Sequence, residues 1–220
     1  GEAVAAGVQN ALGEDYVVEL AMRYQNPSIP YALKRLMDQE VSEIIVFPMF
    51  PQYASATTGS VYDEVMRNFR KQQTIPNVKM INSYYDNEQM IDIFVDNAKN
   101  FDLESYDHII FSYHGLPQRQ LRKGDHCGNH CLKKENCCST ISKANQFCYS
   151  AQCFGTTRAL VEKLGLKEGH YSTSFQSRLG PEKWASPYTI DVIEEQAEKG
   201  AKRLLVFSPA FVADCLETTI

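Results

Sequence analysis

The order of residue patterns along this chain predicts an α/β fold, with parallel sheets flanked by helices. Short runs of β-branched and aromatic residues alternate with segments whose apolar residues recur every three or four positions. Parallel strands need a crossover connection that returns over the sheet, and each helical segment provides one. Such sheets bind ligands beyond the carboxyl ends of their strands, so residues that follow a predicted strand are the first candidates for chemistry.

Six runs have the length and composition of strands. Each is short, rich in Val, Ile, Phe or Tyr, and bounded by polar, Gly or Pro residues. In chain order they are residues 16–24, 43–50, 78–85, 108–114, 170–175 and 203–207.

Five segments between these strands carry an apolar face at helical spacing. Two of them end at a glycine, Gly165 or Gly200, which suits the left-handed cap of a helix. The five faces consist of Leu33, Leu36 and Met37; Val61, Val65, Met66 and Phe69; Met90, Ile91, Phe94, Val95 and Ala98; Leu160, Val161 and Leu164; and Ile190, Ile193 and Ala197.

Residues 122–148 interrupt the alternation of strands and helices. Apolar periodicity is lost there, Gly and Asn are frequent, and five of the seven cysteines fall between Cys127 and Cys148. We interpret the segment as an insertion between the strand that ends at His114 and the helix near Leu160.

Composition and charge exclude several classes of function. The apolar and charged fractions are ordinary for a folded globular protein. A net charge of −5, with acidic and basic residues interspersed, gives no footprint for a polyanion, so nucleic acid is not an expected partner. The longest apolar runs, such as residues 44–47, are too short to span a bilayer, and no signal-peptide pattern opens the chain. We expect a cytoplasmic protein and leave surface attachment to a membrane open.

Both ends of the chain read as truncated. It begins at Gly1, in a helical pattern without an initiator Met, and it stops at Ile220 directly after a strand. We therefore expect flanking segments to complete the fold.

Two residues that follow predicted strands can carry proton or metal chemistry. His114 ends an apolar run and precedes Gly115, and a histidine titrates near neutrality and binds metals. Glu217 follows the last predicted strand and supplies a carboxylate. Position alone equally allows a hydrogen-bonded histidine at a strand end and a solvated or capping glutamate, so neither residue decides the function by itself.

Four short motifs, called sequence words below, give these candidates a context by their resemblance to a known family. They are PMFPQY and TTGS within residues 48–60, SYHGLP at 112–117, FQSRLGP at 175–181 with Trp184, Pro187 and Thr189 beyond it, and PAFVADCLET at 209–218. In order and spacing these words resemble the ferrochelatase family, and the resemblance covers roughly residues 23–220.

The resemblance implies two Rossmann-like (chelatase) domains, with a porphyrin held in the cleft between them. Residues 1–84 would be the remainder of the first domain, and residues 85–220 the second domain with its insertion at 122–148. The family's first strand and loop, and its C-terminal return segment, have no counterpart in this chain.

The resemblance also implies an activity in haem biosynthesis, that of a lyase inserting Fe²⁺ into protoporphyrin IX or coproporphyrin III. Two inner N–H protons of the porphyrin must leave as iron enters, so a nearby base is needed. We expect His114 to accept a pyrrole proton or bind the iron, and Glu217 to relay charge. The expected porphyrin contacts are Arg23, Tyr24, Phe211 and Trp184. For Arg23 an ordinary strand end, and for Trp184 a place in the core, are the alternatives.

The cysteines of the insertion suit a metal cofactor, because cytosolic chains rarely hold structural disulfides. No CxxC pair is present, and more than four thiolates suit an iron–sulfur cluster. Some ferrochelatases carry a [2Fe–2S] cluster, and the resemblance to members with an internal cysteine-rich insertion suggests Cys131, Cys137, Cys138 and Cys148 as its ligands.

Several alternatives remain open at the level of sequence. Cys127 could replace one of the adjacent cysteines, Cys153 is left out, and Ser55 stands where another group of the family has a cluster cysteine. Zinc bound by four thiolates, with or without His126 or His130, or a simple disulfide would also account for the cysteines. A cobalt chelatase of the same fold and an iron–sulfur redox or sensing module are the alternative functions. The preferred porphyrin, membrane contact and oligomeric state are left open.

Overall fold

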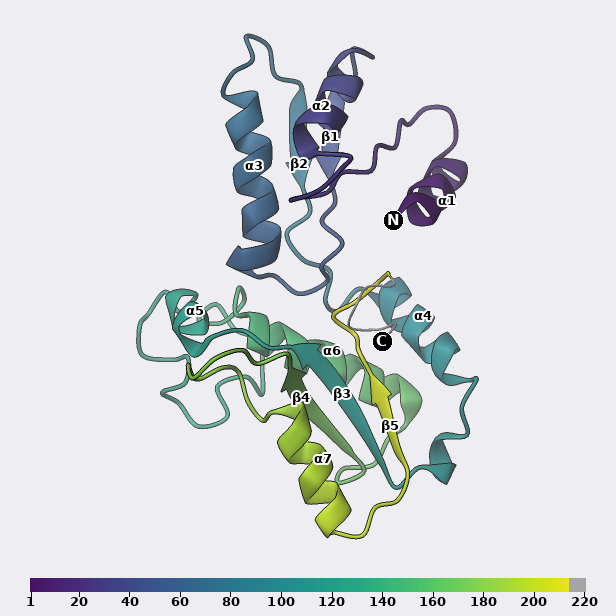
Figure 1. Ribbon diagram of the computed structural model, residues 1–220, viewed down its shortest axis with the longest axis vertical. Helices are drawn as coiled ribbons and strands as arrows, with labels where there is room; N and C mark the ends of the chain where they lie inside the picture. Colours follow the sequence, from purple (N-terminus) through teal and green to yellow (C-terminus); the bar gives the residue numbers. More distant parts are fainter. Residues whose placement is uncertain (214–220) are drawn as a thin grey trace. The chain divides into compact units, whose positions relative to one another are not determined.

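The chain forms two compact units, each with its own hydrophobic core. The computed structural model describes residues 1–213. Of these, residues 1–49, 55–82 and 213 form the first unit, and residues 50–54 and 83–212 form the second. Every strand pair in the described residues is parallel, which confirms the predicted α/β class with parallel sheets flanked by helices (Figure 1).

The first unit packs two helices against a two-stranded sheet. Its elements are α1 (Glu2–Leu12), α2 (Ile29–Met37), β1 (Glu43–Val46), a π-helical turn (Ser55–Gly59), α3 (Ser60–Phe69) and β2 (Asn77–Met80). Ser28 caps α2 by accepting a hydrogen bond from the backbone of Tyr31, and Pro30 stands in the first turn, where its missing N–H costs nothing. Apolar residues from α2, α3 and β1 form the core: Ile29, Leu33, Ile44, Val65 and Phe69.

The second unit is built on a three-stranded parallel sheet in the order β4-β3-β5. Its elements are α4 (Glu88–Ala98), a 3₁₀ turn (Leu103–Ser105), β3 (His108–His114), α5 (Gln118–Lys123), α6 (Tyr149–Leu164), β4 (Tyr171–Gln176), α7 (Thr189–Glu198) and β5 (Leu204–Phe207). β3 is the middle strand and is almost entirely buried. Its register places His114 opposite Gln176 of β4.

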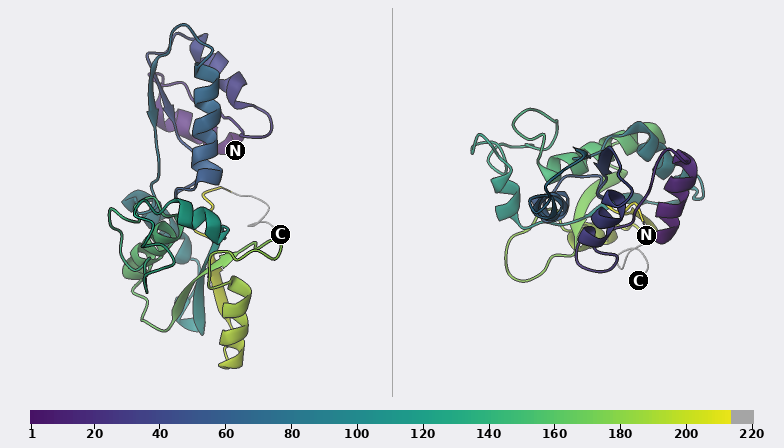
Figure 2. Two further views of the ribbon diagram at one scale, coloured as in Figure 1. Left: turned by 90° about the vertical axis from the view of Figure 1, so that its left-hand side faces the viewer. Right: turned by 90° about the horizontal axis from the view of Figure 1, so that it is seen from above.

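Helices cover both faces of this sheet. α6 lies against one face with α4 packed beside it, and α7 lies against the other face (Figures 1 and 2). The helix α6 ends at Gly165, whose φ of 65° confirms the predicted left-handed cap. The face toward α6 is aromatic, with Phe111, Tyr113 and Phe175 fully buried, so the core of the unit lies there.

The predicted strand at residues 16–24 is wrong. Apart from an isolated bridge between Met22 and Ser28, these residues pair with no strand in the described part of the chain. Instead, the backbone N–H of Val18 donates to the side chain of Gln9 at 2.8 Å. An extended segment without a neighbouring strand makes no ladder of hydrogen bonds, whatever its β-propensity.

The other five predicted strands exist, but two are shorter than predicted. β1 ends at Val46, two residues before Pro48, which has no N–H to donate to a ladder. β2 ends at Met80, and residues 81–84 form neither helix nor strand.

The cysteine-rich segment is irregular, as predicted. Between the end of α5 and the start of α6, residues 124–148 contain no helix or strand. Residues 1–213 contain no helix with the length and apolar character that crossing a membrane would require.

Candidate functional site

His114 lies at the C-terminal edge of the three-stranded sheet, as the last residue of β3. The backbone N–H of the next residue, Gly115, donates to the backbone oxygen of Gln176 at 2.8 Å. A Cβ on Gly115 would lie 3.0 Å from that oxygen and 3.2 Å from Cε3 of Trp184, so only glycine fits without displacement. The strand therefore ends with its half-buried imidazole at the edge where parallel sheets bind ligands.

A hydrogen bond defines the tautomer of His114. Nδ1 lies 2.8 Å from the backbone oxygen of Gly115. Because a carbonyl oxygen only accepts, Nδ1 is the donor of this bond, so Nε2 is the nitrogen that has a lone pair whenever the ring is neutral. The hydroxyl of Tyr149 donates to the backbone oxygen of His114 at 2.8 Å and holds the strand end in place. Nε2 is thus the ring atom that can accept a proton or bind a metal ion.

Trp184 lies beside His114, with the two ring centroids 6.4 Å apart. Its backbone oxygen accepts a hydrogen bond from Gln118 at 3.2 Å, and the next residue, Ala185, donates to the backbone oxygen of Leu116 at 2.8 Å. The indole Nε1 is buried and has no acceptor among the described residues. The structure therefore brings two of the predicted site residues together, Trp184 and His114.

A network of hydroxyl groups lies on the face of β3 and β4 that carries α7. The hydroxyl of Ser112 donates to Oε1 of Gln176 at 3.2 Å and lies 2.8 Å from Oγ1 of Thr189. That atom in turn lies 2.9 Å from Oγ of Ser174. Ser112 and Ser174 are fully buried. Sequence reasoning found Ser112, Gln176 and Thr189 only as letters of family words and gave them no role.

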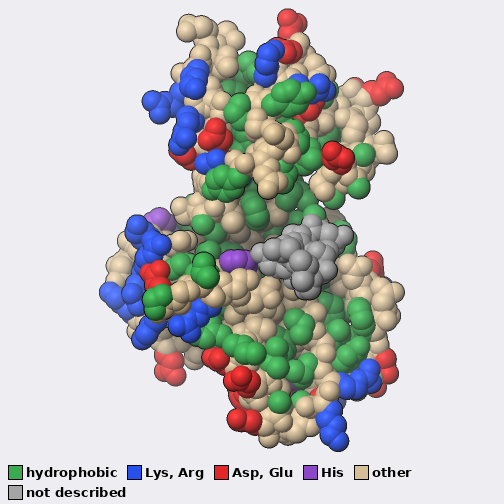
Figure 3. Space-filling view, viewed as in Figure 1, with side chains coloured by type: hydrophobic (Ala, Val, Ile, Leu, Met, Phe, Trp, Pro, Cys, Tyr) green, Lys and Arg blue, Asp and Glu red, His purple; other side chains and the backbone are tan. Residues whose placement is uncertain are grey.

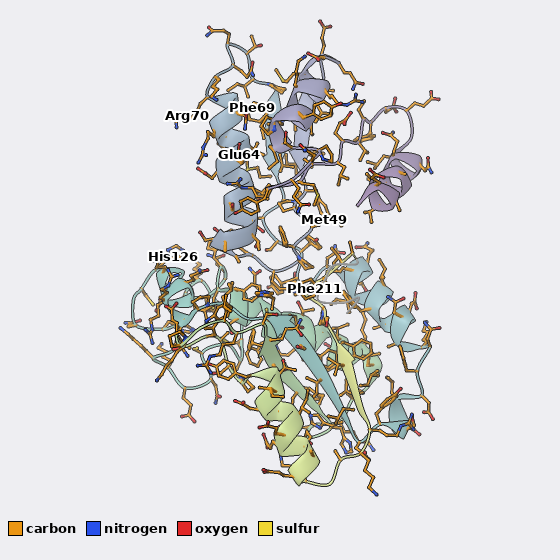
Figure 4. The ribbon with its side chains drawn as sticks, viewed as in Figure 1. Met49, Glu64, Phe69, Arg70, His126 and Phe211 are labelled. Atoms are coloured by element: carbon orange, nitrogen blue, oxygen red, sulfur yellow. The ribbon has the colours of Figure 1, made fainter. Side chains whose placement is uncertain are left out.

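In the first unit, Arg23 and Tyr24 come together with the first residue of α3. Nε of Arg23 donates to the backbone oxygen of Ser60 at 3.0 Å and lies 2.9 Å from its hydroxyl. The guanidinium stands 4.6 Å from the ring centroid of Tyr24 and 3.6 Å from the carboxylate of Glu64, which Figure 4 labels on α3. Tyr24 as a whole residue is 80% exposed. This pair of residues is thus fixed by the TTGS word, and its aromatic face is open to a ligand.

The last two predicted site residues come after β5. Phe211, labelled in Figure 4, is half-buried against the core of the second unit, and its N–H donates to the backbone oxygen of Ser208 at 3.1 Å. Glu217 lies outside the described residues. Its pairing with His114 therefore stays a prediction.

Four thiols of the insertion interact with one another. Sγ of Cys137 lies 3.8 Å from Sγ of Cys138. Hydrogen bonds from the thiols of Cys131 and Cys138, together with backbone N–H groups in the first turn of α6, lower the pKa of Cys148 to about 3. The same interaction with Cys148, added to burial, raises the pKa of Cys131 and of Cys138. These are the four cysteines predicted to act as ligands.

Asp125 fixes the start of the cysteine segment. Its carboxylate accepts hydrogen bonds from the thiol of Cys127 and from the backbone N–H groups of Cys127, Gly128, His130 and Cys131. These bonds hold the pKa of Asp125 well below its usual range. Because the exposed thiol of Cys127 is bound to this carboxylate, it is not part of the group formed by the other four thiols.

The six described cysteines are free thiols, so the simple disulfide finds no support among them. Within residues 1–213, no three His, Cys, Asp or Glu side chains are arranged to hold a single metal ion. The described part of the chain therefore contains neither a preformed zinc site nor a preformed group that would bind the predicted [2Fe–2S] cluster. Nε2 of His130, one of the alternative zinc ligands, instead lies 3.0 Å from the backbone oxygen of Cys137.

Positive charge is concentrated around these thiols. Residues 118–148 contain six Lys and Arg residues against two acidic ones, although the whole chain carries −5. All six cationic residues are exposed, and Figure 3 shows such side chains gathered over α5 and the segment that follows it. The segment that holds these cysteines is therefore locally basic.

Comparison with known proteins agrees with the four sequence words. The family model described as Ferrochelatase matches residues 1–220. The chain is 43% identical over 202 residues to a ferrochelatase of Pseudomonas fluorescens (strain SBW25) and 45% identical over 202 residues to one of Ectopseudomonas mendocina (strain ymp). In both comparisons the match covers 91% of this chain and 59% of the relative, so the chain spans about three fifths of the length of these relatives. Because the family model covers the whole chain, the chain belongs to the ferrochelatase family.

Proposed function

We propose that the protein to which this chain belongs is a ferrochelatase, a lyase of haem biosynthesis that inserts Fe²⁺ into protoporphyrin IX or coproporphyrin III. One observation carries the proposal beyond family membership. Nδ1 of His114 is committed to the backbone oxygen of Gly115, which leaves Nε2 as a base at the ligand-binding edge of the sheet. A metal-insertion reaction on a porphyrin needs such a base.

The reaction exchanges two protons for one metal ion. Two pyrrole N–H bonds break, Fe²⁺ binds four ring nitrogens, and two protons leave toward bases outside the ring. Nε2 of His114 accepts a pyrrole proton or binds the incoming iron. The carboxylate of Glu217 relays positive charge, as a proton or as iron, to or from His114. A positioned base of this kind is typically worth about 10²–10⁴ in rate.

The proposed porphyrin contacts are one cationic side chain, that of Arg23, and three aromatic ones. Arg23 presents a guanidinium, which pairs with carboxylates such as the propionates of a porphyrin, and the exposed ring of Tyr24 offers an apolar face. Trp184 and Phe211 contribute aromatic surface in the second unit. We propose that residues 1–84 and 85–220 belong to the first and second domains of the chelatase.

The test of the proposed function is haem formation by the whole protein. Anaerobic Fe²⁺ and protoporphyrin IX, or coproporphyrin III, should give the haem absorption spectrum. His114→Ala should slow haem formation by at least about 10²-fold. His170→Ala removes an exposed histidine at the opposite end of the sheet and should leave the rate unchanged. Near wild-type iron insertion by His114→Ala would remove the assigned role, and insertion of Co²⁺ in preference to Fe²⁺ would favour a cobalt chelatase.

We also propose that Cys131, Cys137, Cys138 and Cys148 bind a [2Fe–2S] cluster. Their mutual interactions and the positive charge around them support this assignment. These four thiols would hold the cluster, and because no three ligand side chains surround one point in residues 1–213, they would have to come together as it binds. When bound, the cluster would supply a one-electron redox centre. Because metal binding and local folding are coupled, the segment is expected to close around the cluster.

Iron and acid-labile sulfide analysis of anaerobically purified protein tests the cluster. We expect stoichiometric iron and sulfide and visible absorption above the protein band. Cys148→Ser should lower both contents, whereas Cys127→Ser, which changes an exposed thiol bound to Asp125, should leave them unchanged. A colourless protein without iron and sulfide would rule out the assignment.

We propose a cytoplasmic protein that touches a membrane at its surface. The helix α1 buries none of its residues and exposes Val4, Val8 and Leu12, which repeat every four positions along one side. An apolar stripe of this kind can lie in a bilayer interface. Vesicle flotation of the whole protein should detect the contact, and Val8→Asp should weaken it; equal flotation of both proteins would contradict it.

A further inference from the structure

Residues 118–148 form a basic surface on an otherwise acidic chain. They carry a net charge of +4, so the other residues of the chain carry −9, an asymmetry that the overall charge of −5 conceals. Lys and Arg side chains gather over α5 and the segment that follows it (Figure 3). An anionic partner is therefore attracted to this face and repelled by the rest of the chain. The exposed cations of the surface are Arg119, Arg122, Lys123, Lys133, Lys134 and Lys143.

Most of this positive charge has no counter-charge within the protein. Of the six cations, only Arg119 forms an ion pair among the described residues, with a carboxylate oxygen of Glu182 at 2.9 Å. The side chains of Lys123, Lys134 and Lys143 have neither a hydrogen bond nor an ion pair in the described part of the chain. Their ammonium groups are therefore available to anions outside the protein, and their attractions add over a common surface.

An exposed leucine lies among these cations. Leu132 directly precedes Lys133 and Lys134, is 41% exposed and has a φ of 59°. A leucine rarely adopts this left-handed conformation, and residues held in such sparsely populated conformations cluster at binding surfaces. Phe147, near the other end of the segment, is 39% exposed. Apolar side chains between flexible cations are typical of protein surfaces that lie on a bilayer.

We propose that residues 118–148 bind the headgroups of an anionic phospholipid bilayer. The cations pair with lipid phosphates, and Leu132 enters the interfacial layer between them. An acidic protein would also attract the cations, but protein interfaces are depleted of lysine, and four of the six cations are lysines. The inference goes beyond the proposed reaction. It adds an electrostatic membrane contact to the apolar one proposed for α1, which contains no Lys or Arg.

Flotation of the whole protein with two kinds of vesicle tests the contact. One kind is phosphatidylcholine alone, and the other is an equal mixture of phosphatidylcholine and phosphatidylglycerol. We expect much stronger binding to the anionic vesicles at about 0.1 M salt, and its loss at about 1 M salt, because the Debye length falls from about 10 Å to about 3 Å. Binding through α1 alone would depend little on salt or headgroup, because its exposed stripe is apolar.

A pair of double variants with the same change in charge locates the surface. Each cation beside an anionic bilayer typically strengthens binding about fivefold, so Lys133→Gln with Lys134→Gln should weaken binding to anionic vesicles at least about tenfold. The control, Lys199→Gln with Lys202→Gln, changes two exposed lysines of the same unit at the opposite end of the sheet and should bind like wild type. Leu132→Asn, which suits the left-handed backbone, should weaken binding without lowering the melting temperature.

Each result supports or overturns the inference. Equal flotation of the wild-type protein with both kinds of vesicle would overturn it, and so would equal losses in the two double variants. Binding to immobilised poly-glutamate without flotation on anionic vesicles would assign the surface to an acidic protein and overturn the lipid contact. If the Lys133 and Lys134 variant does not fold, the salt and headgroup dependence of the wild type decides. Absence of haem formation would overturn the proposed function and leave the flotation result standing.

Discussion

Arg23 combines three interactions that a lysine could not reproduce. Its guanidinium reaches the backbone and hydroxyl oxygens of Ser60, the carboxylate of Glu64 and the ring of Tyr24. The planar guanidinium has several N–H donors and can contact all three groups at once, whereas the ammonium group of a lysine is a single point of charge. We therefore predict that Arg23→Lys raises KM for the porphyrin about tenfold and leaves kcat nearly unchanged.

Steady-state kinetics of iron insertion measure this effect. The matched control is Arg67→Lys, which changes an arginine of α3 that pairs with Asp63 and Glu64 but contacts neither Tyr24 nor Ser60. Its KM should equal that of the wild type. Equal KM values for Arg23→Lys and wild type would show that Arg23 only supports the start of α3.

At the scale of single residues, the sequence predicted identities better than arrangements. The resemblance to the family was enough to name His114, Trp184 and Arg23 as candidates. They did not show that the oxygen of Gly115 decides the tautomer of His114, or that the amide of Gln176 is half unpaired. Those properties depend on hydrogen bonds between residues far apart in the chain, and no local pattern encodes them.

Two helix glycines have opposite surroundings, although both occupy helix interiors. In α6, a Cβ added to Gly155 would lie 2.8 Å from Cε2 of Tyr85, which is closer than real Cβ contacts. In α1, a Cβ added to Gly7 would meet nothing within 4 Å. Alanine favours a helix over glycine by about 1 kcal/mol, whereas overpacking costs about 1–3 kcal/mol. We predict that Gly155→Ala destabilises its unit by about 1 kcal/mol and that Gly7→Ala stabilises α1.

Urea unfolding of the second unit, followed by fluorescence of Trp184, the one tryptophan within residues 1–220, measures the first effect. Amide hydrogen exchange in α1 measures the second, since that helix buries no residue and opens locally. The double variant Gly155→Ala with Tyr85→Ala should regain stability relative to additivity, because the ring that clashes is gone. A stabilised Gly155→Ala single variant would show that Tyr85 can move aside without cost.

At the scale of elements, a run with a strand pattern formed a strand only where another strand lies beside it. The apolar run 108–114 became the middle strand, with neighbours on both sides, and the five helical faces all formed helices. Residues 16–24 have an equally strong β pattern, and yet no strand lies beside them in the described residues. Strand propensity records a fit to a half-buried pleated surface, and whether that surface exists is decided elsewhere in the chain.

For the molecule as a whole, the fold class could be predicted from the sequence, but the geometry of the cysteine-rich segment could not. Alternating strands and helices were enough to predict parallel sheets covered by helices, because crossover geometry leaves few alternatives. The thiols of the insertion were identified by spacing and resemblance. Their mutual hydrogen bonds depend on α6, whose first turn supplies N–H groups to Cys148. An irregular segment takes its shape from what it packs against, so its geometry could not be read from the insertion itself.

Global stability should depend on pH through His108, at the opposite end of β3 from the candidate site. This histidine is 4% exposed, and its Nε2 lies 2.8 Å from the hydroxyl of Ser172. Burial first, and then the positive charges of Lys199 and His170, lower the pKa of His108 from its usual 6.5, while Glu195 opposes the shift. Between the lowered folded pKa and 6.5 the unfolded chain binds more protons than the folded one, so stability falls as pH falls through that window.

We therefore predict that His108→Gln flattens the fall in unfolding free energy between about pH 7 and pH 5, even if it lowers stability at pH 7. Above the window both states hold a neutral His108, so its protonation makes no contribution there. Urea unfolding at several pH values, followed by Trp184 in the same unit, gives the slope. His126→Gln serves as the control, because His126 is an exposed histidine of the insertion and the variant should keep the wild-type slope. The same slope in His108→Gln and wild type would mean that other groups, chiefly carboxylates, set the acid limit of this protein.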